Sequence, residues 1–129
     1  MKKTIIETQS APQAIGPYSQ AVSVSNDGQT VYISGQIPLD PGTMEVVSQD
    51  FVEQAKQVCK NLSAVVDAAG GGLSDIVKLT VYLTDLGRFV ELNQVMDEYF
   101  EQPYPARAAI EVSALPKQVQ IEIDAVLVF

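Results

Sequence analysis

The chain has 129 residues, of which 47% are hydrophobic, so we expect residues 1–129 to form one compact domain around a single core. Sixteen acidic and eight basic side chains give a net charge of −8, which repels phosphate backbones and argues against a nucleic-acid partner. One cysteine and no histidine exclude disulfide frameworks, histidine-based triads, Cys-His dyads and ordinary zinc sites.

The N-terminal stretch MKKTIIETQSAP has two lysines but only a brief apolar pair behind them, so it lacks the apolar region of a signal peptide. No window approaches the length of a membrane span, and we expect a cytosolic protein without a membrane partner. The stretch TVYISGQIP, residues 30–38, is rich in β-formers and lies between the turn signals NDGQ and DPGT. We therefore predict a meander of small strands, two of which flank residues 26–29.

Apolar residues recur at helical spacing between residues 51 and 69, which predicts a helix. Ser48 or Asp50 can cap its start, and the three glycines at 70–72 end it. Cys59 lies in the apolar stripe of this helix. We interpret it as a small buried hydrophobe rather than a reactive thiol.

The alternating residues 74–84 predict a strand, and the apolar pattern from Phe89 to Phe100 predicts a second helix, ended by Pro103 and Pro105. Two further strands follow, and residues 119–129 have one wholly apolar face. Two helices on one face of a sheet predict an α+β layer sandwich with parallel or mixed strand pairing.

The other face of this sheet is too apolar to stay wet in a soluble monomer, so we expect another subunit to bury it. The residues expected to point away from the helices are Tyr32, Ile76, Tyr82, Ala109, Val126 and Val128.

Without histidine, any chemistry must use other side chains, the backbone or water, and Arg107 stands out among small and apolar neighbours. If Ile110 points to the helices, alternation sends Arg107 and Ala109 to the opposite face, together with Glu122. Arg107 and Glu122 could then share a pocket. Periodicity alone still favours a surface arginine, or a structural ion pair with Glu122, over a functional site.

Five ordered segments carry a resemblance that spans nearly the whole chain: APQAIGPYSQAV, ISGQIP, DIVKLTVYLTDL, PARAAIEVSALP and VQIEIDAV. Together they resemble the successive signatures of the RidA/YjgF/UK114 family. The resemblance implies a chorismate-mutase-like α+β fold. It also implies a homotrimer whose sheets form a central barrel, with three clefts between subunits.

The resemblance further implies hydrolysis of reactive 2-imino acids, or the equivalent enamines, to 2-oxo acids and ammonia, without a cofactor or a metal. Examples are 2-iminobutanoate and 2-iminopropanoate, which pyridoxal-phosphate dehydratases release. The family's carboxylate-binding arginine falls on Arg107, whose guanidinium suits a bidentate grip on a planar carboxylate. The family's catalytic glutamate falls on Glu122, which could hold the attacking water and take its proton.

The resemblance also assigns substrate-binding roles to Tyr18 of GPY and to Ser34 and Gly35 of SGQ. Tyr18 could close the pocket with its ring or hydrogen-bond through its hydroxyl. Judged without the family, Tyr18 and Ser34 are as readily packing residues as site residues. Asn93 matches a family asparagine that we expect to cap or buttress a neighbouring loop.

The chain departs from the family at Ala108 and Ala109, where many members carry Ser-Cys, so a thiol contribution is absent. Imine hydrolysis needs a bound carboxylate and an activated water rather than a covalent nucleophile, so the backbone at Ala109 can suffice. The absent thiol also keeps open a module that binds small carboxylates without turnover. The ribonuclease label that some members have carried fits least, because the chain has no histidine and no basic track.

Overall fold

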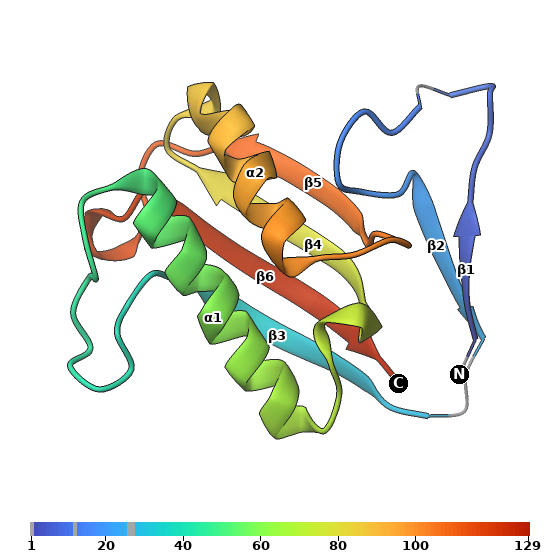
Figure 1. The fold of residues 1–129 in the computed structure, drawn as a ribbon, viewed down its shortest axis with the longest axis horizontal. Helices are drawn as coiled ribbons and strands as arrows, with labels where there is room; N and C mark the ends of the chain where they lie inside the picture. The colour runs from blue at the N-terminus through green and yellow to red at the C-terminus, as the bar shows by residue number, and fades with distance from the viewer. Residues whose placement is uncertain (1, 12, 26–27) are drawn as a thin grey trace.

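The computed structural model describes residues 2–11, 13–25 and 28–129. Within these residues, short 3₁₀ turns precede β4, α2 and β6, and no helix combines the length and apolarity needed to cross a membrane. The strands and helices are β1 (Lys2–Ile6), β2 (Ala21–Ser25), β3 (Thr30–Gln36), α1 (Phe51–Ala69), β4 (Ile76–Leu83), α2 (Phe89–Tyr99), β5 (Ala106–Glu111) and β6 (Ile121–Val128) (Figure 1).

Helix α1 begins and ends where its capping residues predict. The carboxylate of Asp50 accepts a hydrogen bond from the backbone N–H of Glu53 at 3.0 Å, which satisfies one of the free donors of the first turn. Gly70 ends the helix with φ 97°, a left-handed conformation that glycine adopts without a steric penalty. Cys59 is buried in the apolar face of this helix, as predicted.

The main sheet has the strand order β3-β6-β4-β5, in which β4 and β5 are parallel and the other neighbours are antiparallel. Helix α2 connects the two parallel strands, and both helices lie on the same face of the sheet (Figure 1). The core fills the space between the helices and this face, with Leu79 and Ile123 among its fully buried residues. The predicted α+β arrangement with mixed strand pairing is confirmed.

The first two strands form a separate hairpin rather than the start of a meander. Strand β2 pairs with β1 in antiparallel register, whereas β3 pairs with β6 in the main sheet. The expected turn at residues 26–29 lies partly outside the described residues. The prediction of a strand on each side of it is confirmed, but their direct pairing is wrong, because β3 instead joins the long C-terminal strand that completes the sheet.

Strand β5 presents its residues in the opposite phase from the one predicted. Ile110 is 45% exposed, whereas Ala109 packs against the core and Arg107 reaches residues of α2. Arg107 and Ala109 therefore point to the helix side, and Glu122 points to the other side of the sheet. Alternation gives the wrong inward face for this edge strand, because its apolar face, with Ile110, lies away from the helices and the face that carries Arg107 lies toward α2.

We call the sheet face away from the helices the outer face; Tyr82, Glu122 and Val126 lie on it, and Tyr32 is 79% exposed. Ile76 was expected there but is fully buried in the core, because the register of β4 and β6 shifts between residues 76 and 78. Val128 is also buried rather than exposed.

Candidate functional site

The guanidinium of Arg107 lies at the junction of strand β5, helix α2 and the segment before β2. Its Nη1 donates a hydrogen bond to Oδ1 of Asn93 on α2, at 2.8 Å. Its Cζ lies 5.1 Å from the ring centroid of Tyr18 and 5.3 Å from that of Phe89. These distances are within the range of cation–π attraction, so two aromatic rings and an amide define the orientation of the guanidinium. We call these four residues the arginine cluster.

The charge of Arg107 is partly buried, and among the described residues no carboxylate forms a direct ion pair with it; Asp97 acts on it only through a longer-range attraction. The one ion pair among residues 2–11, 13–25 and 28–129 joins Arg88 and Glu91, at 3.0 Å. Burial lowers the pKa of Arg107 below its ordinary value, although Tyr18 and Asp97 act in the opposite direction, and an arginine remains a cation at neutral pH. A structural ion pair between Arg107 and Glu122 is therefore not formed within one chain. A half-buried cation without a direct ion pair is suited to bind an anionic group from outside.

A tight turn places Tyr18 beside Arg107. The backbone N–H of Tyr18 donates to the carbonyl of Gly16 at 2.8 Å, and the Tyr18 hydroxyl accepts a hydrogen bond from the N–H of Ile15 at 3.4 Å. A side-chain carbon added at Gly16 would lie 3.6 Å from Nη2 of Arg107 and from Nδ2 of Asn93. Glycine at this position therefore keeps space beside the two nitrogens.

Glu122 has a different setting, against the backbone of β3. The pairing of β3 with β6 shifts register between Ile33 and Gln36, so Ser34 and Gly35 form a bulge, and both are exposed. A side-chain carbon added at Gly35 would lie 2.1 Å from Oε2 of Glu122, a distance that no real contact shows. Only glycine at residue 35 allows Glu122 to lie across the strand as it does.

A second acidic residue and a tyrosine accompany Glu122 on the outer face. Tyr82 lies directly opposite Glu122 in the β4–β6 pairing, and its hydroxyl donates to Oδ2 of Asp124 at 2.8 Å. This hydrogen bond raises the pKa of Tyr82. We call Ser34, Gly35, Tyr82, Glu122 and Asp124 the glutamate cluster.

The structure divides the sequence-predicted site residues between these two clusters. Tyr18 lies beside Arg107 at the β5 edge and Ala109 follows on the same strand face, whereas Ser34 and Gly35 lie beside Glu122. The expectation that Arg107 and Glu122 lie on the same face of the sheet is wrong. It assumed that Ile110 points to the helices, whereas Arg107 does.

Two features of the arginine cluster differ from the sequence interpretation. Asn93, expected to cap or buttress a loop, instead accepts the hydrogen bond of Arg107. The sequence pattern places Phe89 on the apolar face of the second helix and does not predict its ring contact with Arg107. An aromatic residue four positions before an asparagine lies on the same side of a helix, which is the signal that could have linked the two.

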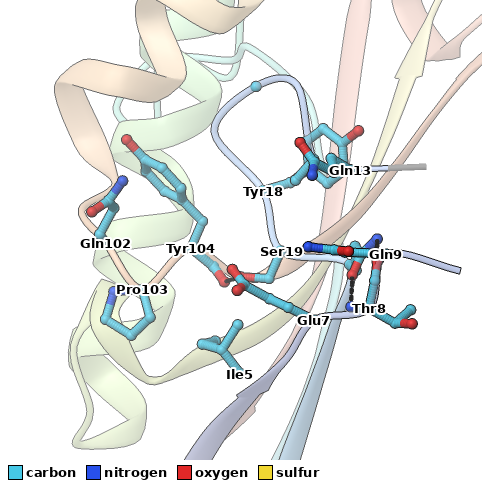
Figure 2. Close-up of a pocket in the computed structure, with 13 residues that line it drawn as sticks. Ile5, Glu7, Thr8, Gln9, Gln13, Tyr18, Ser19, Gln102, Pro103 and Tyr104 are labelled. Atoms are coloured by element: carbon cyan, nitrogen blue, oxygen red, sulfur yellow. Dashed lines mark hydrogen bonds between the residues drawn. The ribbon is translucent and has the colours of Figure 1, made fainter. Parts of the chain in front are cut away.

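A cavity with a volume of about 1080 Å³ lies next to the arginine cluster. It opens between the segment that precedes β2 and the turn at residues 102–104, as Figure 2 shows. Gly16 and Tyr18 line it and also adjoin Arg107, which itself is not part of the lining. Tyr18 therefore forms the boundary between this cavity and the guanidinium.

Comparison with known proteins shows the family of the chain. A family model described as Endoribonuclease L-PSP matches residues 8–129. The chain is 50% identical over 126 residues to a RutC family protein of Pyrococcus abyssi, covering 98% of this chain and 97% of that protein. It is 47% identical over 126 residues to the 2-iminobutanoate/2-iminopropanoate deaminase of Homo sapiens, covering 98% and 90%.

Solved structures are similar over the same length. RidA from an Antarctic Psychrobacter bacterium has a TM-score of 0.76 and 51% identity, covering 98% of this chain and 99% of that one. TdcF of E. coli, solved with bound serine, has a TM-score of 0.72 and 44% identity, covering 98% of both chains. The sequence match and the shared fold extend over nearly the whole chain, which therefore belongs to the RidA/YjgF/UK114 family.

Proposed function

We propose that the protein hydrolyses 2-imino acids, such as 2-iminobutanoate and 2-iminopropanoate, to 2-oxo acids and ammonia. The observation that carries this proposal is the half-buried guanidinium of Arg107, which two rings and an amide orient and which forms no direct ion pair with a carboxylate of the described chain. Such a group is suited to the carboxylate that every 2-imino acid carries. The deaminase name of the human relative supports the same substrate class.

We infer that the arginine cluster of one subunit meets the glutamate cluster of the next in a homotrimer. The two clusters lie on opposite faces of one sheet, so one chain cannot bring both to the same small substrate. Exposed Tyr32 and Ile110 give the outer face apolar surface that a neighbouring subunit would bury. A closed ring uses the same pair of surfaces at each of its interfaces, which yields one shared cleft per interface.

In the assembled cleft, Arg107 would hold the substrate carboxylate and Glu122 would orient a water molecule toward the imine carbon. The water oxygen adds to that carbon while Glu122 takes one water proton, and the C=N electron pair moves to the nitrogen, which receives that proton from Glu122. The hydroxyl proton of the tetrahedral adduct then passes through Glu122 to the nitrogen, so that the C=O bond forms, the C–N bond breaks, ammonia leaves and Glu122 is again a carboxylate. The backbone N–H at Ala109 and the residues Tyr18, Ser34 and Gly35 would complete the substrate pocket.

A coupled assay tests the activity directly. A threonine dehydratase generates 2-iminobutanoate, and the formation of 2-oxobutanoate is followed with and without this protein. We expect acceleration well above spontaneous hydrolysis; an unchanged rate at equimolar protein and dehydratase would contradict the proposal. Sedimentation should show a trimer, and a monodisperse monomer at micromolar concentration would remove the shared cleft.

A second candidate function is binding of small carboxylates without turnover. The Ala108–Ala109 pair lacks a thiol, and the solved structure of TdcF contains bound serine, which carries a carboxylate. In that case 2-oxobutanoate would bind with Arg107 intact, but the coupled assay would show no acceleration. The ribonuclease in the family model's description fits less well, because a charge of −8 offers no basic track for RNA.

A further inference from the structure

The turn that leads into β5 is held by residues from the N-terminal part of the chain. Three successive backbone carbonyls in this turn accept hydrogen bonds from the N-terminal part of the chain. The carbonyl of Pro103 accepts from Nζ of Lys3 at 3.3 Å, that of Tyr104 accepts from Oγ of Ser19, and that of Pro105 accepts from the backbone N–H of Ser19 at 2.9 Å. Figure 2 shows Ser19 lying against Tyr104. Ser19 thus fixes two of the three positions.

Ser19 lies next to two members of the arginine cluster. It forms a parallel bridge with Ala106, on the free edge of strand β5 and one residue before Arg107. The residue before Ser19 is Tyr18, whose ring lies on the guanidinium of Arg107. In the N-terminal segment, the anchor Ser19 and the ring-bearing Tyr18 are therefore consecutive residues, and in β5 the bridge residue Ala106 and Arg107 are also consecutive.

The side chain of Ser19 has its own role in this anchor. Ser19 is only 9% exposed, so its hydroxyl has little access to water and depends on the Tyr104 carbonyl. Removal of the hydroxyl would leave that carbonyl without this donor, while the backbone hydrogen bond to Pro105 would remain. The expected result is a looser attachment of the segment that carries Tyr18, not loss of the fold.

We propose that Ser19 is a positioning residue for the carboxylate grip, because its hydroxyl holds the Tyr18 ring on the guanidinium of Arg107. The link to substrate rests on the proposed function, whereas the link from Ser19 to Arg107 does not. Without the ring, Arg107 loses one of its two aromatic neighbours and samples more orientations. Substrate affinity should then fall while the chemical step at Glu122 is unaffected.

Arginine Nε–Hε resonances test the link to Arg107 without any activity. The sequence has two arginines, so two resonances are expected, and Arg88→Lys assigns them. Ring currents from Tyr18 shift the Arg107 resonance, and Tyr18→Leu calibrates that shift. We expect Ser19→Ala to move the Arg107 resonance toward its position in Tyr18→Leu and to leave Arg88 unmoved.

Three further variants make this measurement decisive. Ser19→Thr retains a hydroxyl and should restore the wild-type resonance, while Ser23→Ala on the exposed side of β2 should have no effect. If Ser19→Ala does not fold, Ser19→Cys, which keeps the size with a weaker donor, should show a smaller shift in the same direction. An unmoved Arg107 resonance in a folded Ser19→Ala or Ser19→Cys variant would overturn the proposal.

The kinetic readout then separates positioning from general stability. Loss of one hydrogen bond should raise KM for the imine by about 3- to 10-fold in Ser19→Ala, with kcat within about twofold of wild type. Because Ser19 acts through Tyr18, the double variant Tyr18→Leu/Ser19→Ala should be no worse than Tyr18→Leu alone. If the double variant lost affinity by the sum of the two single losses, Ser19 would not act through Tyr18. Absence of any wild-type turnover would refute the proposed function but leave the resonance test valid.

Discussion

The hydrogen bond from Nη1 of Arg107 to Oδ1 of Asn93 joins the edge strand β5 to helix α2 across 2.8 Å. The amide oxygen accepts one guanidinium proton without adding a negative charge, so the cation is oriented but not neutralised. A carboxylate in the same place would orient Arg107 equally well and would compete with an incoming anion. The identity of residue 93 therefore affects whether Arg107 can bind a ligand carboxylate.

Replacement of Asn93 by aspartate should impair ligand binding more than its replacement by alanine. Asn93→Asp supplies a carboxylate of the same size that pairs with Arg107, whereas Asn93→Ala only removes the orienting acceptor. Isothermal titration of 2-oxobutanoate into both variants checks this order. Equal affinity of the aspartate variant and the wild type would show that Arg107 does not receive the ligand carboxylate.

Arg107→Ala should abolish both binding of 2-oxobutanoate and imine hydrolysis. A charged hydrogen bond contributes roughly 1.5 to 3 kcal/mol and a bidentate pair more, so the dissociation constant should rise by about 10-fold at least. Arg107→Lys should rescue poorly, because an ammonium lacks the planar fork. Calorimetry and the coupled assay measure the two properties, and wild-type affinity in the alanine variant would exclude the carboxylate grip.

Glu122→Gln should separate binding from turnover. The amide keeps the shape of the side chain and one acceptor but cannot take a proton, and loss of a general base usually costs about 10²- to 10⁴-fold in rate. Removal of a negative charge near a bound anion should leave the affinity for 2-oxobutanoate unchanged or slightly higher. The comparison requires that the variant sediments like wild type. Hydrolysis near the wild-type rate would eliminate Glu122 as the base.

The thiol of Cys59 should be unreactive in the folded protein. Burial raises its pKa to about 12, with the nearby Glu98 as a smaller cause. The folded pKa lies above the unfolded value of 9.0, so the contribution of the buried thiol to stability is complete below pH 9 and lost as the pH rises toward 12. Reaction with a disulfide reagent at pH 8 should therefore be slow until urea unfolds the chain.

The matched variant for this effect is Cys59→Ala. Between pH 8 and pH 10.5, the free energy of unfolding measured in urea should decrease more for wild type than for Cys59→Ala, since other groups titrate alike in both. Rapid labelling of native protein at pH 8 would contradict the burial of this residue. The reagent has one possible target, because the sequence has one cysteine.

The features that the sequence predicted well are those set by local rules. Helix α1 begins at the Asp50 cap and ends at Gly70, and the burial of β6 alternates from Ile121 to Leu127 because one of its faces packs against the helices. These signals lie within one element and do not depend on its partners. The assignment of Glu122 to the face away from the core follows from the same alternation.

The features that the sequence predicted poorly depend on contacts between distant segments. The phase of β5 follows from the position of α2 over Arg107, and apolar Ile110 gave the opposite indication. Strand β2 pairs with β1 and not with β3. The turn signal between β2 and β3 predicts a turn there, but it does not show which strand pairs with β2. The role of Ser19 arises from a turn more than eighty residues away in the sequence.

The separation of Arg107 and Glu122 by the thickness of one sheet makes two inactive variants complementary. In the proposed ring, each cleft takes its arginine from one chain and its glutamate from another, so chains carrying Arg107→Ala and chains carrying Glu122→Gln can each supply what the other lacks. Random assembly from equal amounts would leave about a quarter of the clefts with both residues intact. Co-refolded chains should then recover hydrolysis that neither preparation has alone. The fraction of the wild-type rate that is recovered would measure how many clefts combine residues from two subunits.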